Sequence, residues 1–368
     1  MSTECTELGN GLLVGTRKGL FRLRQSPAEP EWQLDGPHIP GYEVIHACVA
    51  PRNPGLIHAA VYHPVWGAHI YRSADHGDTW EPLAVSPHFD DDRYGSRLNS
   101  IWFLAWSPDG DALYAGIDPA GLFVSRDAGG SWQAVNGLNE HATRNRWEPA
   151  KGIFAAHSIC INPQDPKQMA VAVSAGGVYL SGDGGTSWQP GNTGVRAENL
   201  PEPEPIAGHN VHRLIMHPRS PQRLYRQCYN GTYRSDDGGR SWVEITDGLP
   251  SDFGYAIATP FADPDTVFQI PESGSHLRTA VDGKLRVYRS HDGGLNWVSA
   301  SAGLPGQHAY VTVLREAIDT DHAQGVFSGT SSGHLFASAD SGESWHMIAG
   351  FLPRILCVLA TPLRSVNP

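Results

Sequence analysis

Short stretches in which apolar and polar residues alternate recur along the whole chain, with turn-forming residues between them. Four of them follow one another at 211–218 (VHRLIMHP), 223–229 (RLYRQCY), 232–235 (TYRS) and 242–245 (WVEI). Alternation with a period of two residues is typical of β-strands that bury one face. The pattern therefore predicts a unit of four short strands, the first of which is the most apolar.

The same unit is repeated along the chain. Further apolar stretches expected to form the innermost strand of a unit lie at 44–51, 101–108, 157–163, 255–260 and 309–316. Between the third and fourth strands stands an eight-residue motif, S-x-D-x-G-x-[S/T/N]-W. It occurs six times, at 73–80, 125–132, 181–188, 235–242, 290–297 and 338–345.

The tryptophans that close these motifs set the size of the repeat. Together with Trp32 they recur at intervals of 48 to 56 residues. A period of about fifty residues with several short strands per repeat is typical of a β-propeller. The sequence therefore predicts an all-β fold, a single seven-bladed β-propeller of four-stranded antiparallel blades over residues 1–368.

The ends of the chain are expected to meet in the first blade. Residues 9–35 supply three strands but no innermost one, and 354–362 (RILCVLATP) resembles an innermost strand without a blade of its own. Pairing the two segments closes the ring and hides the sheet edges. Blade one is thus predicted from 9–35 plus 354–362, and blades two to seven from 42–84, 98–135, 154–190, 209–245, 252–298 and 307–348.

The repeated motif has the chemistry of a turn. An Asp side chain accepts hydrogen bonds from nearby backbone N–H groups, Gly allows a positive φ, and the Trp ring is suited to burial. A residue needed in every blade is expected to stabilise the blade. The predicted structural aspartates are Asp75, Asp127, Asp183, Asp237, Asp292 and Asp340.

Composition narrows the range of partners. The formal net charge of the 368 residues is −11 and no Lys/Arg-rich run is present, which argues against nucleic acid or an anionic membrane surface. The five cysteines are odd in number, lack C-x-x-C spacing and are expected to be reduced. The first residues do not resemble an export signal, so a cytoplasmic protein is expected.

Long loops indicate where a site is to be expected. The insertions at 86–99, 139–152, 196–210 and 271–285 are all predicted on one face, where innermost strands begin. Loops gathered at one end of a rigid scaffold commonly carry a binding site. The predicted ligand-binding residues at this face are Arg17, Asn99, Trp102, His157, His212, Tyr255, Arg286 and His308, and Asp118, Arg278 and Arg354 are expected nearby.

This mixture of Arg, His, Asn and aromatic side chains suits a polar ligand, either anionic or sugar-like. The alternative is a pore lined by polar residues only because water fills it. No short metal-binding motif is present, and neither a metal nor another cofactor is expected.

The eight-residue motif resembles the Asp-box, or bacterial neuraminidase repeat, of sialidases, xyloglucanases, sortilin-type receptors and photosystem II assembly factors. The chain is similar to exo-α-sialidase-like, or glycosyl hydrolase-like, Asp-box proteins at 14–21, 98–106, 210–218, 249–257 and 285–290. The resemblance implies a propeller, and a glycan or other polar small molecule as ligand. The R-I-P motif of sialidases is absent, which argues against sialidase activity itself.

Two functions follow from this resemblance and remain open. The first is a glycoside hydrolase, which requires two carboxyl groups at the sugar site, or a Tyr nucleophile activated by a Glu, for which Tyr255 and Tyr310 are candidates. Asp252 and Glu148 are the predicted catalytic residues, with Glu204 and Asp282 as other candidates on the same loops. The second is a non-catalytic propeller that serves as a protein-binding or assembly scaffold.

Overall fold

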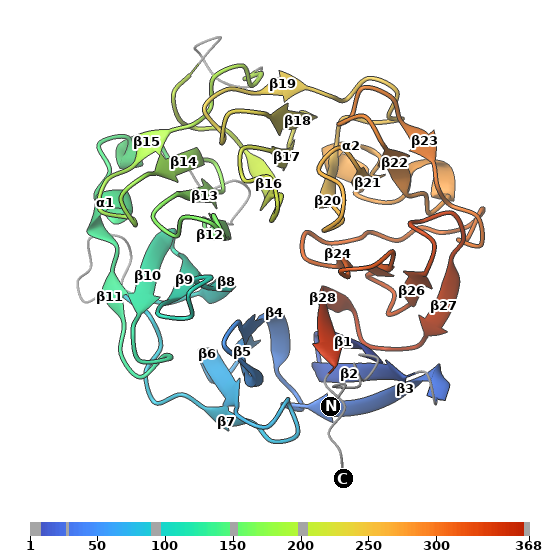
Figure 1. Cartoon of the computed structure of the whole chain (residues 1–368), viewed down its shortest axis with the longest axis horizontal. Coiled ribbons are helices and arrows are strands. Elements are labelled where there is room, and N and C mark those ends of the chain that lie inside the picture. The colour runs from blue at the N-terminus through green and yellow to red at the C-terminus, as the bar shows by residue number, and fades with distance from the viewer. Residues whose placement is uncertain (1–8, 27–28, 90–96, 148–153, 198–204, 364–368) are drawn as a thin grey trace, which may run out of the picture.

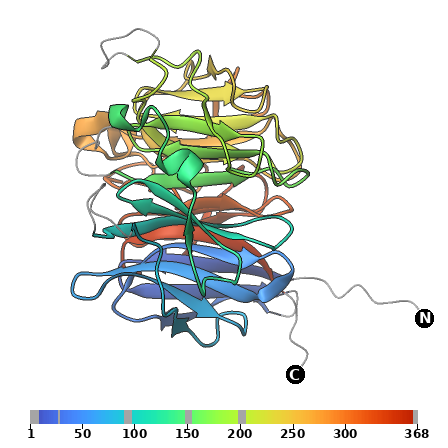
Figure 2. The same ribbon diagram turned by 90° about the vertical axis from the view of Figure 1, so that its left-hand side faces the viewer.

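The computed structural model describes residues 9–26, 29–89, 97–147, 154–197 and 205–363. Within them, seven antiparallel sheets of four strands surround a central axis (Figure 1). The predicted seven-bladed propeller is confirmed. Figure 2 shows the blades edge on and the short helix α2 (Gly274–Leu277), in orange, projecting from one face of the ring.

The first four blades each run from an innermost to an outermost strand. Blade one is β28 (Ile355–Leu363), β1 (Gly9–Thr16), β2 (Gly19–Ser26) and β3 (Glu29–His38); blade two is β4 (Glu43–Ala50), β5 (Asn53–His63), β6 (Gly67–Ser73) and β7 (Glu81–Pro82); blade three is β8 (Ser100–Trp106), β9 (Leu113–Asp118), β10 (Gly121–Ser125) and β11 (Gln133–Ala134); blade four is β12 (Ala156–Ile161), β13 (Met169–Val173), β14 (Gly177–Ser181) and β15 (Gln189–Pro190).

The last three blades keep this order. Blade five is β16 (Val211–Met216), β17 (Leu224–Cys228), β18 (Gly231–Ser235) and β19 (Val243–Glu244); blade six is β20 (Gly254–Ala258), β21 (Val267–Pro271), β22 (Tyr288–Ser290) and β23 (Val298–Ser299); blade seven is β24 (Ile318–Thr320), β25 (Val326–Gly329), β26 (Leu335–Ser338) and β27 (His346–Ala349). Besides α2, the loops carry α1 (Asn136–Asn139) and 3-10 turns at Arg144–Arg146 and Val281–Gly283.

Ring closure occurs as predicted, by pairing of the two ends of the chain. Strand β28 pairs antiparallel with β1, with Val14 opposite Val358 and Leu12 opposite Ala360. The register shifts between Gly15 and Thr16, where β1 ends. The first blade is therefore held together by segments more than three hundred residues apart in sequence.

Blade seven differs from the sequence prediction. Its innermost strand is β24, and the apolar segment 309–316 that was expected to fill this place is irregular. The backbone of the segment bonds elsewhere: Ala309 donates to the carbonyl of Gly283 (2.8 Å), and the carbonyl of Val311 accepts from Ala280 (2.8 Å). The first part of the segment is thus bonded to the blade-six loop and not to a strand of blade seven.

The aspartate of each eight-residue motif accepts hydrogen bonds within its own turn. Asp237 accepts from the Ser241 amide (3.0 Å) and the Ser241 hydroxyl (2.6 Å), and Ser235 Oγ donates to it (2.8 Å). The other five aspartates accept equivalent bonds, although the side-chain donor at Asp292 is the amide of Asn296 and not a hydroxyl. Hydrogen bonds from Ser131 and Ser125 hold the pKa of Asp127 at about 2.

Glycine and tryptophan complete the turn. Gly239 has φ 91°, and its amide donates to Ser235 Oγ (2.8 Å). An L side chain there would be strained, and its Cβ would lie 2.9 Å from Leu180. The ring of Trp242 is buried and donates to the carbonyl of Gly191 (2.9 Å) in the preceding blade. The turn therefore fastens one blade to the next.

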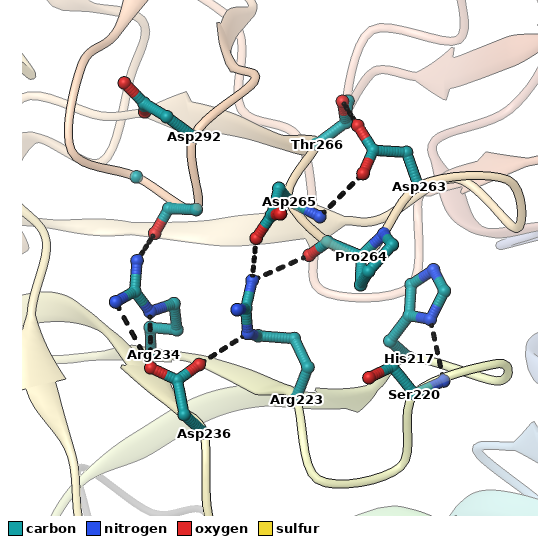
Figure 3. Close-up of polar contacts among 12 residues, drawn as sticks. His217, Ser220, Arg223, Arg234, Asp236, Asp263, Pro264, Asp265, Thr266 and Asp292 are labelled. Carbon is teal, nitrogen blue, oxygen red and sulfur yellow. Dashed lines mark hydrogen bonds and ion pairs between the residues drawn. The ribbon is translucent and has the colours of Figure 1, made fainter.

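Arginine and aspartate side chains link blades five and six (Figure 3). Arg223 binds Asp236 (2.6 Å) and Asp265 (2.5 Å), and Arg234 also binds Asp236 (3.2 Å). Each of these guanidinium groups has a carboxylate partner, as is usual where charges are partly buried for a structural purpose.

Candidate functional site

A cavity of about 940 Å³ lies at the mouth of the central channel. We call it the mouth cavity. Its wall is formed by residues at or near the starts of innermost strands and the ends of second strands, together with the irregular segment 309–317. The antiparallel pairing Ser100↔Asp118 shows why these positions meet, since β8 begins where β9 ends. The mouth cavity is lined by Arg17, Glu43, Ile45, Tyr62, Asn99, Ser100, Trp102, Asp118, His157, Ser174, Asn210, Val211, His212, Tyr229, Tyr255, Arg278, Thr312, Leu314, Arg315, Glu316, Ser331, Arg354 and Leu356.

Four arginines give the mouth cavity its cationic character. Arg17 forms an ion pair with Glu43 (3.4 Å), which also lines the cavity. For Arg278, Arg315 and Arg354, no carboxylate of the described residues lies within ion-pair distance. In a chain of net charge −11, three guanidinium groups without acidic partners at one cavity favour the binding of an anion.

Arg315 is held between two aromatic rings on the cavity wall. The carbon of its guanidinium lies 4.9 Å from the ring centre of Tyr255 and 5.5 Å from that of Trp102. Its buried Nε has no hydrogen-bond partner among the described residues. Burial lowers the pKa of Arg315, yet a guanidinium remains charged in proteins. The rings hold the cation by cation–π attraction and leave its N–H groups available.

Two buried histidines contribute hydrogen-bonding groups but no charge. Burial lowers the pKa of His157 to about 3, and burial also lowers that of His212 well below its usual value. His212 Nδ1 donates to the carbonyl of Gly254 (2.6 Å), which leaves Nε2 as an acceptor. His157 Nε2 is buried and has no partner in the described structure.

Three carboxyl groups belong to the lining of the cavity, those of Glu43, Asp118 and Glu316. Burial raises the pKa of Asp118, although Asn99 Nδ2 donates a hydrogen bond to it (3.1 Å). Glu43 is paired with Arg17. Glu316 binds Arg213 of β16 (3.2 Å), so that this ion pair joins blade seven to blade five, which are not neighbours in the ring.

Unsatisfied polar atoms are concentrated at this cavity. Buried side-chain atoms of the described residues that lack a partner and belong to its lining are Ser100 Oγ, Trp102 Nε1, His157 Nε2, Asn210 Oδ1, Arg315 Nε, Glu316 Oε1 and Arg354 Nε. Buried polar groups are usually hydrogen-bonded because leaving them unpaired is costly. Their concentration here indicates a surface built to bind a polar molecule or ordered water.

Six of the predicted ligand-binding residues line the mouth cavity, and they come from five blades. These are Arg17, Asn99, Trp102, His157, His212 and Tyr255. Three other predicted residues, Asp252, Arg286 and His308, are not part of its lining.

Asp252 is turned toward Arg196 (3.8 Å), and its side chain is 49% exposed. Arg286 lies nearest the carboxylate of Asp282 (4.0 Å), two residues before β22 begins. His308 is exposed, and it does not stand at the start of a strand because 309–316 does not form one. Glu148, the other predicted catalytic residue, and Glu204 lie outside the described residues.

Arg315 and Glu316 could not be selected by the positional argument, because both lie inside a predicted strand. Glu43 was also missed, although it stands at the start of an innermost strand and was therefore accessible to the same positional argument. In the described part of the chain, no group of three or more His, Cys, Asp or Glu side chains is arranged to hold a metal ion. None of the helices there is long and apolar enough to cross a membrane.

Comparison with known proteins finds similarity to several propellers. A sequence model described as Sortilin, neurotensin receptor 3 (Sortilin-Vps10) matches residues 120–279. An oligoxyloglucan-reducing end-specific xyloglucanase of Emericella nidulans (strain FGSC A4) is 26% identical over an alignment of 201 residues, which covers 47% of this chain and 24% of that enzyme. The chain thus spans about a quarter of the length of this curated relative.

Solved structures with a similar fold come from proteins with different activities. An ancestral GH74 enzyme superposes with a TM-score of 0.55 at 17% identity, covering 87% of this chain and 38% of that one. YCF48 bound to D1 peptide gives a TM-score of 0.54 at 14% identity, covering 98% and 96%. A putative 6-phosphogluconolactonase from Bacteroides fragilis NCTC 9343 gives 0.58 at 11% identity, covering 98% and 100%. At these identities the likeness shows the fold alone.

Proposed function

We propose that the mouth cavity binds the acidic end of a glycan, or a sugar acid of similar size. The observation that carries this proposal is the set of three guanidinium groups, those of Arg278, Arg315 and Arg354, which share one cavity without a carboxylate partner. Arg223, which links blades five and six, instead has two carboxylate partners. An anion supplied by the ligand would complete the pairing at the cavity.

The remaining lining residues suit the rest of a sugar. Trp102 and Tyr229 offer ring surface for the apolar side of a pyranose, and Asn99 and Asn210 offer amide groups to its hydroxyls. The unpaired atoms Trp102 Nε1 and Asn210 Oδ1 supply one donor and one acceptor. A ligand that is both anionic and rich in hydroxyl groups uses all of these features.

Hydrolysis of a glycoside is the reaction we propose for this site. It requires an acid that is protonated and a second group that is ionised. Asp118, whose pKa is raised by burial, fits the first role, and Glu43, paired with Arg17, fits the second. The sequence similarity to a xyloglucanase supports the reaction class, and the arginines favour an acidic substrate in this chain.

Isothermal titration calorimetry with D-glucuronate and D-glucose tests the binding proposal. Glucuronate is expected to bind more tightly than glucose, which has the same ring without the carboxylate. Arg315→Gln should weaken glucuronate binding roughly 10- to 150-fold, the equivalent of one charge-assisted hydrogen bond. Arg286→Gln, which removes a guanidinium outside the cavity, is the matched control and should bind as the wild type does. Equal affinity for the two sugars would contradict the proposal.

A protein-binding scaffold is the second candidate function. Large apolar side chains are exposed on loops at the cavity face: Trp66 is 66% exposed between β5 and β6, and Phe351 is 96% exposed between β27 and β28. Exposed apolar residues around a concave site are typical of protein contacts. Binding of immobilised acidic peptides that is lost in Trp66→Ser/Phe351→Ser, with no measurable affinity for sugar acids, would favour this candidate.

A further inference from the structure

Glu272 lies directly behind the wall of the mouth cavity. It follows β21, and only 1% of its surface is exposed. Its Oε1 accepts a hydrogen bond from the hydroxyl of Thr312, which lines the cavity, and its Oε2 has no partner among the described residues. Burying a carboxyl group with only one hydrogen-bonded oxygen costs folding free energy. This cost suggests that Glu272 has a functional role.

Thr312 is the best-anchored residue of the irregular segment 309–317. Its amide donates to Ser331 Oγ (3.0 Å), and its carbonyl accepts from the Ser331 amide (2.9 Å). The hydroxyl bond to Glu272 is a third attachment. Three residues further on, the same segment places Arg315 between Tyr255 and Trp102. Glu272 therefore helps to fix the segment that presents the guanidinium.

The charge of Glu272 also acts on the cavity directly. The charged and titratable groups around it are Arg315 on segment 309–317, Arg278 after α2 and Tyr255 on β20, and each of them interacts electrostatically with the carboxyl group. An ionised Glu272 would oppose the attraction that both arginines exert on an incoming anion. A neutral Glu272 keeps the hydrogen bond from Thr312 and leaves that attraction intact.

We propose that Glu272 is a positioning residue for anion binding, which in its neutral form anchors Thr312 and Arg315 and in its ionised form weakens anion capture by the neighbouring guanidinium groups. This inference rests on the proposed anion site. Burial raises the pKa of Glu272 to about 7, so its charge changes in the neutral range. Anion affinity is therefore highest about one pH unit or more below 7 and decreases as the pH rises through 7. His157 and His212 stay neutral over this range and do not contribute to the change.

The test is the affinity of the full chain for D-glucuronate at pH 6 and pH 8, measured by calorimetry with the wild type, Glu272→Gln and Thr312→Val. The carboxylate of glucuronate stays ionised at both pH values, so any change of affinity belongs to the protein. The wild type should bind roughly threefold or more tightly at pH 6 than at pH 8. Glu272→Gln, a neutral isostere, should bind equally at both values, with the affinity that the wild type shows at pH 6. Thr312→Val should bind more weakly than the wild type at pH 6.

The control is Glu81→Gln, which removes an exposed carboxylate paired with Arg72 and should keep the wild-type pH profile. Glucuronate binding that depends on Arg315 but has the same affinity at pH 6 and pH 8 would overturn the role of Glu272 and leave the proposed function intact. Absence of glucuronate binding in the wild type at both values would overturn the proposed function itself. If Glu272→Gln does not fold, the role of Glu272 is judged from two other results. The wild type should bind glucuronate more tightly at pH 6 than at pH 8, and Thr312→Val should bind it more weakly than the wild type at pH 6.

Discussion

The guanidinium of Arg315 lies 4.9 Å from the centre of the Tyr255 ring, although the two residues come from different blades. The ring accounts for how a cation without a carboxylate partner is kept at the cavity wall, since cation–π attraction is strong when water is partly excluded. The same contact leaves the N–H groups of Arg315 free for a ligand. We therefore expect the ring of Tyr255 to contribute more to ligand binding than its hydroxyl does.

The role of the Tyr255 ring is open to a direct test. Tyr255→Leu should weaken glucuronate binding roughly 2- to 30-fold, because the loss of a cation–π contact of about 0.5–2 kcal/mol leaves Arg315 less well placed. Tyr255→Phe keeps the ring and is the matched control, with an affinity close to that of the wild type. Calorimetry on the three proteins measures the difference. Equal weakening by Leu and Phe would assign the effect to the hydroxyl instead.

A second prediction concerns Asp118 as the general acid. If it protonates the departing oxygen, Asp118→Asn should lower kcat roughly 10²- to 10⁴-fold on alkyl glycosides of the acidic sugar. The loss should be much smaller on the 2,4-dinitrophenyl glycoside, whose leaving group needs no proton. Because burial raises the pKa of Asp118, the alkaline limb of the pH profile should reflect its ionisation, and activity should fall as the pH increases through that pKa. An equal loss on both substrates would contradict the assignment.

Most of the fold could be predicted from the sequence because six of the seven blades repeat the same local sequence pattern. Alternating strands and the S-x-D-x-G-x-[S/T/N]-W turn depend on neighbours within a few residues, and the structure shows those neighbours bonded together, as Ser235 and Asp237 are. Ring closure was also accessible, since residues 354–362 have the character of an innermost strand with no blade of their own.

The site was less predictable because it depends on where repetition fails. Segment 309–316 has the alternation of a strand, but Ala309 and Val311 bond to the blade-six loop and the segment is irregular, with Arg315 in the lining of the cavity. Arg286 and Asp252 stand near the correct face, yet their side chains lie near Asp282 and Arg196. Position along the chain indicated the face of the ring but could not give the direction of each side chain.

The hydrogen bonds and buried ring of each turn lead to a prediction for the stability of two variants. Trp242→Ala should lower the free energy of unfolding by about 3–5 kcal/mol, because it truncates a buried ring. Asp237→Ala should lower it by about 1–2 kcal/mol through the hydrogen bonds lost within the turn. Chemical denaturation measures both values. Asp237→Ala with wild-type stability and impaired ligand binding would show that the aspartate has a role in the site.

Acid should destabilise the propeller through the same turns. Hydrogen bonds hold the pKa values of Asp75, Asp127, Asp183, Asp292 and Asp340 at about 2 in the folded protein, below the usual value of 3.8. Depressed carboxyl pKa values contribute stability that is present above pH 4 and is lost as the pH falls toward 2. Melting temperatures measured from pH 5 to pH 2 should therefore fall most steeply below pH 4. A melting temperature that stays constant over this interval would contradict the role of the turns.

Ring closure leads to a further prediction. Deleting residues from Arg354 onward removes β28 and leaves β1 as an unpaired edge beside the channel. Unpaired edges promote association between sheets, so the truncated protein should aggregate, as size-exclusion chromatography would show. A substitution within β28 that keeps its backbone pairing, such as Leu359→Val, should remain monodisperse. A folded, monomeric truncation would mean that the ring does not need this strand.

The most direct test of the central claim is a crystal structure of the protein soaked with D-glucuronate. We predict that the sugar occupies the mouth cavity, with its carboxylate within hydrogen-bond distance of Arg315 and either Arg278 or Arg354. Its ring should lie against Trp102 or Tyr229. A sugar bound at another place, or one in the cavity with its carboxylate turned toward solvent and a hydroxyl at Arg315, would contradict the claim that these unpaired arginines form an anion site.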